Sequence, residues 1–444
     1  MPLNRRTFCL SSLAALAGAP LAGASGANRP NIILMMSDDQ GWGDAGFRGH
    51  PHLKTPALDD MARRGVTFNR FYSASPVCSP TRASCLTGRH PHRIGVFGAN
   101  SGDAKAPSKF PLRKQELTLA EALKQYGYAT GHFGKWHLGN VKGDNANTPA
   151  QHGFDEWFST VRKVSTLDPE DYVHNGEPVA PLKGDDSMHI MNRALPFIEN
   201  AVSNDTPFFT VIWFHTPHVP FIADEEHKAM YEYHSESQQN FWGALTAMDE
   251  QIGRLRRELE RLGAVDDTML WFCSDNGARD SGPGFPGTNL PYRNGKATLY
   301  EGGVRVISLL EWSRMFREPK QVDMACSTSD YLPTIFDYLN IQPDRQVEPI
   351  DGLSMRAALD QGMTMRPKPI GFQYQKRAAW IDGRYKLIAQ IEGDPQYELY
   401  DLESDPSEEK NLAAENPSRV QRLAHQLKLW MESCRRSDLG ADYL

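Results

Sequence analysis

The main hydrophobic signal of the chain is a set of four apolar runs, each followed by a polar cluster. They span residues 31–36, 128–133, 207–214 and 268–273. Such a run is typical of a strand buried on both faces of a parallel sheet, because neither side meets solvent. Open α/β sheets carry their ligand sites at the carboxyl ends of the strands. The pattern therefore predicts an α/β fold with a mostly parallel central sheet and one functional edge.

Apolar residues at helical spacing predict helices between these strands. Thr118 and Glu121 stand at capping-box spacing, and Gly127 is placed to end the helix that they begin. Residues 140 to about 190 are polar and rich in Asp, Asn, Pro and Gly, so we expect loops over the site there. The expected helices are 55–71, 118–126, 241–262 and 331–339.

The last hundred residues follow a different pattern. The segment 341–369 is rich in proline and charge, which indicates a crossing into a smaller domain. Residues 379–388 predict a hairpin with a two-residue turn, and a helix over 417–433 is expected to pack on that sheet. A chain of 444 residues exceeds the roughly 250–300 residues that one core supports. We expect a leader at 1–27, a catalytic domain at 28–345 and a C-terminal subdomain at 346–444.

The first residues are typical of an export signal. Arg5 and Arg6 precede a weak apolar stretch, residues 9–21, which is followed by small-residue cleavage points and is too short to span a membrane. The arginine pair with Phe8 resembles a bacterial twin-arginine signal, with an ordinary secretory signal as the alternative. We expect a periplasmic or secreted protein with no membrane span.

The net charge and the cysteine spacing limit the partners and the disulfides that this protein is expected to have. A net charge of −7 without a basic cluster argues against nucleic acid as the main partner. Cys85, Cys273, Cys326 and Cys434 lack the spacing of a disulfide framework, so we expect mostly free, buried thiols.

The segment 76–89, Pro-Val-Cys-Ser-Pro-Thr-Arg-Ala-Ser-Cys-Leu-Thr-Gly-Arg, has a composition that core packing does not require. Pro76 and Pro80 restrict the backbone on either side of Cys78. If a helix begins after Pro80, the Arg82 guanidinium can fold back toward Cys78 beside the helix N-terminus, where negative charge is favoured. The segment predicts a reactive centre, and a buried structural cysteine in a turn is the alternative.

Polar side chains follow each buried strand. Carboxylates and an amide come after the first and fourth strands. For the two aspartates after the first strand, the alternative is that they are solvated residues of a turn. An all-oxygen set suits calcium, with magnesium less suited to so many carboxylates. Cationic and imidazole groups follow the second and third strands. The oxygen donors are Asp38, Asp39, Asp275 and Asn276, and the cationic and imidazole residues are Lys135, His137, His215 and His218.

Together these segments resemble the type I, formylglycine-dependent sulfatases of the alkaline phosphatase-like superfamily. The matching patterns are C-x-P-x-R with L-T-G-R, D-D-x-G-x-G-D, G-K-W-H-L-G, P-H-x-P and K-x4-E-G-G-x-R, the last beginning at Lys296. Ile307 departs from the family, which usually has proline there. The resemblance implies an α/β/α sandwich with a smaller C-terminal α+β subdomain that carries an antiparallel sheet, whose edge the segment 398–406 resembles.

The resemblance also implies roles for individual residues. Cys78 becomes formylglycine through a formylglycine-generating enzyme, and Asp38, Asp39, Cys78, Asp275 and Asn276 hold calcium. Arg82 orients the residue at position 78, and Lys135 and Lys296 offset charge on the sulfuryl oxygens. Asp275 accepts the proton of the attacking hydroxyl, His218 with Lys296 protonates the departing alcohol, and His137 draws the proton whose loss expels sulfate.

The expected reaction is hydrolysis of sulfate monoesters, on sulfated carbohydrates. The loops 140–183 and 282–295 carry residues suited to sugar hydroxyls and acidic groups, namely Arg162, Lys163, His174, Tyr292 and Arg293. An arylsulfatase is one alternative. A phosphoester or phosphonate hydrolase is another, although phosphatases of the superfamily use Ser or Thr and two zinc ions. If Cys78 stayed a thiol, the protein would be a non-catalytic binder of sulfated glycans. The sequence leaves the oligomeric state open.

Overall fold

The computed structural model describes residues 29–99, 111–143, 146–279 and 284–443. The predicted export signal lies outside these residues. The main sheet has ten strands in the order β12-β2-β11-β9-β1-β8-β4-β5-β6-β7. Their bounds are β1 (Asn31–Ser37), β2 (Val66–Phe68), β4 (Ala129–Lys135), β5 (Glu156–Thr160), β6 (Val173–His174), β7 (Glu177–Pro178), β8 (Phe208–Trp213), β9 (Thr268–Ser274), β11 (Ser308–Glu311) and β12 (Lys320–Val322).

The four predicted strands are neighbours at the centre of this sheet. They are β9, β1, β8 and β4, and each adjacent pair is parallel. In the register, Met36 of β1 lies opposite both Trp213 of β8 and Cys273 of β9. The carboxyl ends of the strands are therefore level, and the polar clusters that follow them meet at one edge, as predicted.

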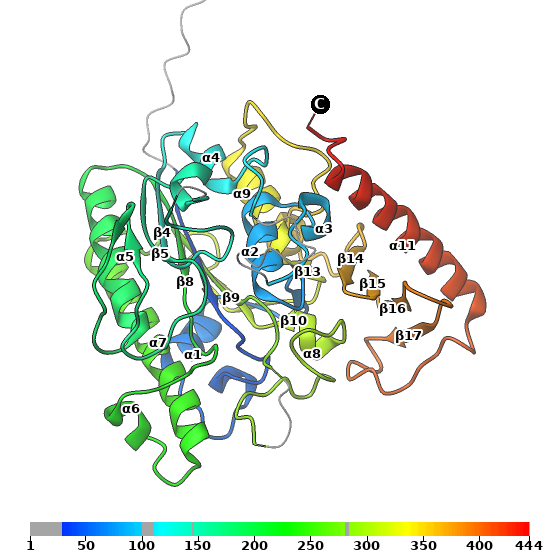
Figure 1. The fold of residues 1–444 in the computed structure, drawn as a ribbon, viewed down its shortest axis with the longest axis horizontal. Helices are drawn as coiled ribbons and strands as arrows, with labels where there is room; N and C mark the ends of the chain where they lie inside the picture. The colour runs from blue at the N-terminus through cyan, green and yellow to red at the C-terminus, as the bar shows by residue number, and fades with distance from the viewer. Residues whose placement is uncertain (1–28, 100–110, 144–145, 280–283, 444) are drawn as a thin grey trace, which may run out of the picture.

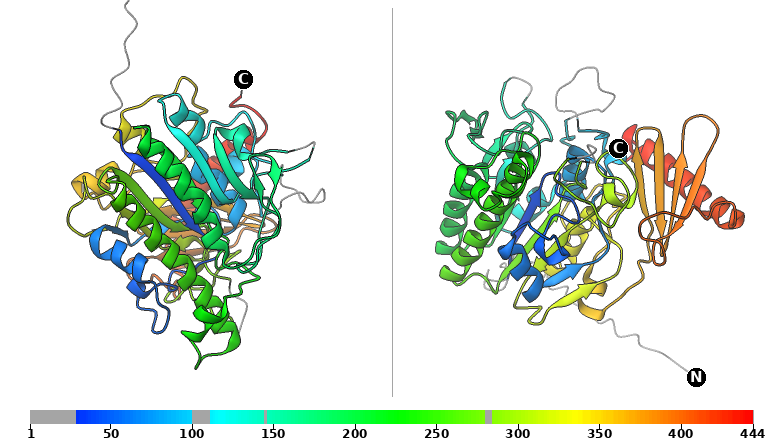
Figure 2. Two further views of the ribbon diagram at one scale, coloured as in Figure 1. Left: turned by 90° about the vertical axis from the view of Figure 1, so that its left-hand side faces the viewer. Right: turned by 90° about the horizontal axis from the view of Figure 1, so that it is seen from below.

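Helices cover both faces of the sheet (Figures 1 and 2). Along β1, Ile32, Leu34 and Met36 pack into one core, whereas Ile33 and Met35 pack into the other, because successive side chains of a strand point to opposite faces. The first core includes α2 (Cys78–Thr87), α3 (Pro91–Ile94), α4 (Leu119–Lys124), α9 (Tyr331–Leu339) and α10 (Arg356–Gln361). The second includes α1 (Pro56–Arg64), α5 (Asp186–Ser203) and α7 (Glu236–Arg261). The predicted α/β/α sandwich is confirmed.

Several element boundaries differ from the prediction. The helix expected over 55–71 ends at Arg64, because Gly65 runs so close to β11 that a Cβ there would lie 2.4 Å from the Leu310 carbonyl oxygen. The region expected to be loops contains β5 and the start of α5, whose first turn is capped by the Asp185 side chain accepting from Met188 N. The predicted capping box of Thr118 and Glu121 is present.

The C-terminal subdomain is an antiparallel sheet with one long helix. In the hairpin, Asp382 pairs with Tyr385, so the two-residue turn consists of Gly383 and Arg384. The strands are β14 (Ile370–Tyr374), β15 (Arg377–Asp382), β16 (Tyr385–Gln390) and β17 (Tyr397–Asp401), and the helix is α11 (Pro417–Asp438).

This sheet lies between the catalytic part and α11 (Figures 1 and 2). Phe372 and Ile388 face Tyr72 and Leu299 of the catalytic part, whereas the opposite face packs on Leu423 and its neighbours in α11. Tyr72 belongs to a small sheet of β3 (Phe71–Tyr72), β10 (Arg305–Val306) and β13 (Cys326–Ser327). Two further short helices are α6 (Glu225–Ala229) and α8 (Glu301–Val304).

The structure also bears on the cysteines and on membrane-spanning helices. Cys85, Cys273, Cys326 and Cys434 are free and buried, as expected, and so is Cys78. Among the described segments, no helix combines the length and the apolar character needed to cross a bilayer.

Candidate active site

The predicted site residues meet where the carboxyl ends of the central strands face the N-terminus of α2. Asp38 and Asp39 follow β1, and Asp275 and Asn276 follow β9. Lys135 is the last residue of β4. Arg82 lies one turn into α2, His137 and His218 follow β4 and β8, and Lys296 comes from the segment before α8. Residues from five parts of the chain outside α2 thus converge on Cys78.

Helix α2 begins at Cys78 itself, three residues before the start after Pro80 that the sequence suggested. Pro80 falls in its first turn, where the backbone N–H groups have no intrahelical partner and proline is tolerated. The Cys78 side chain is almost fully buried, with Sγ 3.4 Å from Asp38 Oδ1 and 3.5 Å from Lys296 Nζ. The helix start therefore fixes the position of the sulfur between a carboxylate and an ammonium group.

The environment of Cys78 keeps its thiol protonated. Burial raises the pKa of the thiol, and the charges of Asp275 and Asp38 raise it further, against the opposing effect of Lys135 and Lys296. Because the thiolate is the nucleophilic form of cysteine, an unmodified Cys78 is a poor nucleophile in this site.

Three carboxylates face three cationic side chains. All are buried or nearly so, and the site is close to neutral in charge before a metal ion or substrate enters. Buried charges persist only when they are paired in this way. The pairs are Lys135 Nζ with Asp38 Oδ2 at 2.6 Å, Lys296 Nζ with Asp39 Oδ2 at 2.7 Å, and Arg82 Nη2 with Asp275 Oδ2 at 2.6 Å.

The pKa values of two of these carboxyl groups, Asp38 and Asp275, are shifted in opposite directions. Burial alone would raise the pKa of Asp38, but Lys135, with further cations around it, holds the pKa well below its usual range. For Asp275, burial and the negative charge of Asp38 outweigh Arg82 and raise the pKa to about 7. Asp275 is therefore the carboxyl group of this site that can exchange a proton near neutral pH.

The geometry fits a hard cation. Ligand atoms of Asp38, Asp39, Cys78 and His218 lie within 4.8 Å of one another. Asn276 Nδ2 donates to Asp39 Oδ1 at 2.8 Å, whereas Asn276 Oδ1 is buried and has no hydrogen-bond partner among the described residues. A buried amide oxygen without a partner is costly unless a cation or water satisfies it. This oxygen-rich donor set suits calcium or magnesium better than zinc.

Both candidate histidines are neutral in this structure. His137 adopts a left-handed backbone conformation, φ 53°, and burial together with the charges of Lys135 and Arg82 lowers its pKa well below the usual value. Burial lowers the pKa of His218 to about 4. His218 Nδ1 lies 2.6 Å from the Val219 carbonyl oxygen, so Nδ1 carries the hydrogen and donates it there. The other ring nitrogen, Nε2, faces Asp39 Oδ2 at 3.6 Å.

Supporting contacts hold the aspartate loop. Asp44, the last residue of D-D-x-G-x-G-D, is fully buried and accepts from Gly41 N and Thr288 N, both at 2.9 Å. Gly41 is required because a Cβ there would lie 2.2 Å from the Thr288 carbonyl oxygen. The structure gives His215 a supporting position too, since it bonds Asp186 and Thr160 rather than the cluster around Cys78.

The sequence did not single out Glu301, Lys386 and Glu408 as a group. Lys386 Nζ lies 2.9 Å from both Glu301 Oε1 and Glu408 Oε1, and all three side chains are fully buried. Glu301 belongs to the K-x4-E-G-G-x-R segment, whereas its partners belong to the C-terminal subdomain. No local spacing relates them, so only the tertiary structure reveals the network.

The structure also locates the loop residues that the sequence offers for substrate contact. Tyr292 is buried, and the Arg293 guanidinium stacks on Tyr300 and donates to Tyr400 Oη at 3.2 Å. Arg162 and Lys163 are both exposed. His174 lies 3.5 Å from Glu156 near the edge of the main sheet. Tyr292 is therefore placed for packing, whereas Arg293 is exposed.

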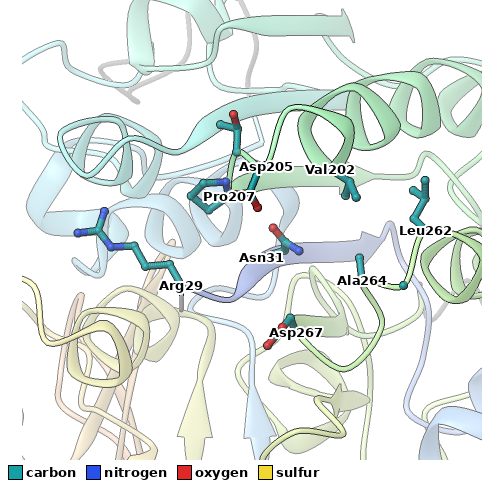
Figure 3. A pocket seen from close by; sticks show the side chains of 10 residues that line it. Arg29, Asn31, Val202, Asp205, Pro207, Leu262, Ala264 and Asp267 are labelled. Atoms are coloured by element: carbon teal, nitrogen blue, oxygen red, sulfur yellow. The ribbon is translucent and has the colours of Figure 1, made fainter. Parts of the chain in front are cut away.

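A separate hollow lies at the opposite edge of the sheet (Figure 3). It has a volume of about 180 Å³ and is lined by Arg29, Asn31, Asp205 and Asp267, among others. These residues precede or begin β1, β8 and β9. The hollow therefore contains none of the residues that follow the strands at the site.

Comparison with known proteins agrees with this geometry. The Sulfatase family profile matches residues 30–341. The N-acetylgalactosamine-6-sulfatase of Mus musculus is 32% identical over 402 residues, which cover 84% of this chain and 74% of the mouse protein. The ulvan-active sulfatase of Formosa agariphila is 29% identical, covering 86% of this chain and 77% of that protein. The crystal structure of Ps i-CgsB in complex with k-i-k-neocarrahexaose has a TM-score of 0.82 and 26% identity, covering 92% of this chain and 94% of that one.

The fold and the convergent site define an enzyme of the alkaline phosphatase-like superfamily. Within it, the chain belongs to the sulfatase family, and it is a sulfuric ester hydrolase.

Proposed function

We propose that the protein hydrolyses sulfate monoesters of carbohydrates, using formylglycine derived from Cys78 together with a calcium ion. The observation that carries the proposal is the placement of Cys78. Its side chain lies between Asp38 and Lys296 at the start of α2, yet burial raises its pKa so that the thiol itself is unreactive. Because buried carboxylates and cations converge on a thiol that is itself unreactive, the site supports conversion of that thiol into another group.

Calcium and formylglycine would each supply one part of the chemistry. When bound, calcium provides positive charge for the sulfate oxygens, and formylglycine provides a hydrated aldehyde as the nucleophile. Asp38, Asp39, Asp275 and Asn276 would hold the cation with the modified residue at position 78. Magnesium is the less suited ion, because the donor set is rich in carboxylates.

The chain's own residues would divide the remaining work. Asp275, with its pKa near 7, would accept a proton at a carboxylate oxygen while Arg82 orients that carboxylate. Lys135 and Lys296 would offset charge on the sulfuryl oxygens as it redistributes in the transition state.

The leaving alcohol needs a proton, and the structure favours Lys296 as its source. Although burial would lower the Lys296 pKa, the nearby carboxylates of Asp39 and Asp38 raise it, so Nζ stays protonated, whereas His218 is neutral. Both Lys296 Nζ and His218 Nε2 face Asp39 Oδ2, so the two groups can share a proton at that position. The neutral His137 would act as a base for the later release of sulfate.

A carbohydrate substrate is supported by the relatives. Two of them carry a sugar or a polysaccharide in their names, and the structural neighbour Ps i-CgsB was solved in complex with k-i-k-neocarrahexaose. A site also selects its substrate by the contacts beyond the reacting group, so turnover must be measured rather than inferred from fold.

The test compares, on one active preparation, two aryl esters, nitrophenyl sulfate and nitrophenyl phosphate, with a panel of sulfated oligosaccharides and their desulfated controls. We expect efficient release of sulfate from at least one oligosaccharide and slow release from the aryl ester. Efficient aryl sulfate turnover with none on any glycan would favour an arylsulfatase. Faster release of phosphate than of sulfate would favour the phosphoester hydrolase.

Export to the periplasm or the medium is part of the proposal. Cell fractionation of the full chain and of an Arg5→Lys, Arg6→Lys variant tests it, because a twin-arginine signal depends on that pair. We expect activity outside the cytoplasm for the parent and retention in the cytoplasm for the variant. Cytoplasmic activity of the parent would contradict export, and export of the variant would indicate the ordinary secretory route.

A further inference from the structure

One buried histidine has no part in the proposed reaction, yet its contacts lead to residues that have one. His215 follows β8 and is fully buried. Its Nδ1 lies 2.8 Å from Asp186 Oδ2, and its Nε2 lies 2.7 Å from Thr160 Oγ1. The Thr160 hydroxyl donates its one hydrogen to the Arg162 carbonyl oxygen at 2.7 Å, so it accepts from the ring. The His215 ring is therefore held at both nitrogens, and Nε2 is the donor to Thr160.

The Asp186 side chain fixes the ring from the side of α5. Asp186 is the first residue of that helix and is fully buried. Its Oδ1 accepts from Tyr172 Oη at 2.6 Å, so the carboxylate is itself held in place. A buried pair of this kind adds little net stability compared with well-packed apolar side chains, because desolvation offsets its attraction. What the pair does provide is a fixed direction for Nε2, since the ring cannot turn without losing the Asp186 contact.

On the Nε2 side, the contact reaches the backbone that holds His137. Thr160 is the last residue of β5, which pairs with β4. Beyond β4, Trp136 N donates to the Thr160 carbonyl oxygen at 3.1 Å, and His137 N donates to the Val161 carbonyl oxygen at 3.0 Å. His137 has φ 53°, which a residue other than glycine keeps only where surrounding contacts enforce it. The end of β5 provides such contacts, and the Thr160 side chain links that end to His215.

The backbone around His215 is anchored to two other residues of the site. The His215 carbonyl oxygen accepts from His218 N at 2.8 Å, and the Thr216 carbonyl oxygen accepts from Asp38 N at 2.9 Å. These bonds use main-chain atoms, so they tie the segment that follows β8 to the end of β1. Because the segment is anchored, the His215 ring presents its donor to β5 from a fixed position.

We propose that His215 is a positioning residue of the reaction, which holds His137 in place through the Thr160 hydroxyl. The inference rests on the proposed function, in which His137 acts as a base, and deepens it by identifying what fixes that base. Within the described part of the chain, the His215 ring bonds no residue of the cluster around Cys78, so it acts through Thr160 and not on the substrate.

Steady-state kinetics of the full chain with Thr160→Val test the proposal. Valine has the shape of threonine without the hydroxyl, so the variant loses the bond from His215 with little change in packing. On nitrophenyl sulfate and the oligosaccharide panel, kcat should fall at least about tenfold and KM should change less than about threefold, because a displaced base slows turnover without weakening substrate binding. Calcium affinity, measured by calorimetry after chelation, should change less than about twofold, since the Thr160 side chain leads to His137 and not to the proposed metal ligands.

Two substitutions of His215 separate the bond to Thr160 from the packing of the ring. A glutamine amide reaches the place of Nε2, whereas an asparagine amide reaches only the place of Nδ1. His215→Gln should therefore retain most of kcat, and His215→Asn should lower kcat as Thr160→Val does. Combining His215→Asn with Thr160→Val should cost no more than either change alone, within about threefold, because both remove the same bond.

Ser159→Ala is the matched control. Ser159 Oγ lies 2.7 Å from His132 Nδ1 and both side chains are fully buried, so this variant loses a hydroxyl–imidazole contact of the same kind. Ser159 precedes Thr160 on β5, so its side chain points to the opposite face of the sheet, and kcat should stay within about twofold of the parent value. Thermal unfolding and the mass of the peptide containing position 78 establish that each variant is folded and equally modified.

The outcomes separate the two proposals. If the parent releases sulfate and Thr160→Val keeps its kcat, the positioning inference is wrong and the proposed function stands. The inference is also overturned if Ser159→Ala lowers kcat as much as Thr160→Val, if calcium affinity falls in step with kcat, or if His215→Gln is no more active than His215→Asn. If the parent releases sulfate from no ester, the proposed function itself fails, and with it the inference.

Discussion

At the scale of single residues, the aspartates after β1 and β9 illustrate how burial, charge and hydrogen bonding set chemistry. Asp38 and Asp275 are both fully buried, yet the pKa of one is lowered and that of the other is raised. The difference follows from the partners, because the cations Lys135, Arg82 and Lys296 act on Asp38, whereas Asp275 lies beside the negative charge of Asp38 itself. Similar residues therefore serve as a permanent anion and as a proton acceptor.

Asp38→Asn should weaken metal binding and lower turnover by orders of magnitude, because it removes an anionic ligand and leaves Lys135 without its partner. Calcium affinity is measured by calorimetry after chelation, and turnover by sulfate release. Chelation should also inactivate the parent, and calcium should restore it. The exposed Asp171→Asn provides the charge-matched control. A fully active, metal-free Asp38→Asn enzyme would contradict the proposed metal site.

Cys85→Ala should keep turnover and lower stability slightly. The Cys85 side chain is fully buried in the core beside α2, so its removal leaves a small cavity that costs about 1 kcal/mol. Thermal unfolding and sulfate release on the same preparation check both parts. Loss of conversion at Cys78 in this variant would show that Cys85 is needed for recognition by the maturation enzyme.

At the scale of elements, the central strands and both ends of α9 could be predicted, whereas the end of α1 and the start of α5 could not. The runs at β1, β8 and β9 consist almost wholly of apolar residues, so burial on both faces was visible in the sequence. The end of α1 depends instead on how closely Gly65 approaches β11, which is a tertiary contact. The start of α5 lay hidden in a polar stretch, because Asp185 and Asp186 resemble loop residues until their hydrogen bonds are known.

Lys386→Met should destabilise the protein by about 3–5 kcal/mol, because it leaves Glu301 and Glu408 as a buried pair without their cation. The measurement is urea unfolding at neutral pH. Lys410→Met is the matched control, since its pair with Glu415 is exposed and contributes about 0–1 kcal/mol. Equal effects of the two substitutions would show that the buried network does not anchor the C-terminal sheet to α8.

At the scale of the whole molecule, the C-terminal sheet packs on the catalytic part with one face and on α11 with the other. The motifs located the site residues because each follows a strand or opens a helix. Tyr374 carries no such signal, since its contact with the catalytic part arises only from the packing of the C-terminal sheet on Tyr72 and Leu299. The boundary at residues 345 and 346 stays a prediction, although the antiparallel sheet beyond it is confirmed.

Acid should weaken the attachment of α11 to the catalytic part. Arg93 lies 2.8 Å from Asp351 and also donates to Ser437 of α11 at 2.7 Å. Against the effect of burial, Arg93 lowers the Asp351 pKa to about 2. Since the folded pKa lies below the unfolded one, this stabilisation is present above about pH 4 and is lost as pH falls toward 2.

Urea unfolding between pH 7 and pH 2 tests this dependence. Asp351→Asn should lower stability at pH 7 by about 2 kcal/mol or more and should flatten the loss of stability below pH 4. Asp323→Asn, at an exposed position, serves as the control. An unchanged acid dependence in Asp351→Asn would contradict the assignment.

The central claim is that Cys78 is the residue that becomes the nucleophile. The most direct measurement is the mass of the peptide containing Cys78, taken from an enzyme preparation whose sulfate release has been established. The account predicts a mass that corresponds to replacement of the thiol by an aldehyde, together with loss of turnover and retention of the fold in Cys78→Ala. An active preparation in which this peptide carries an unmodified cysteine would contradict it.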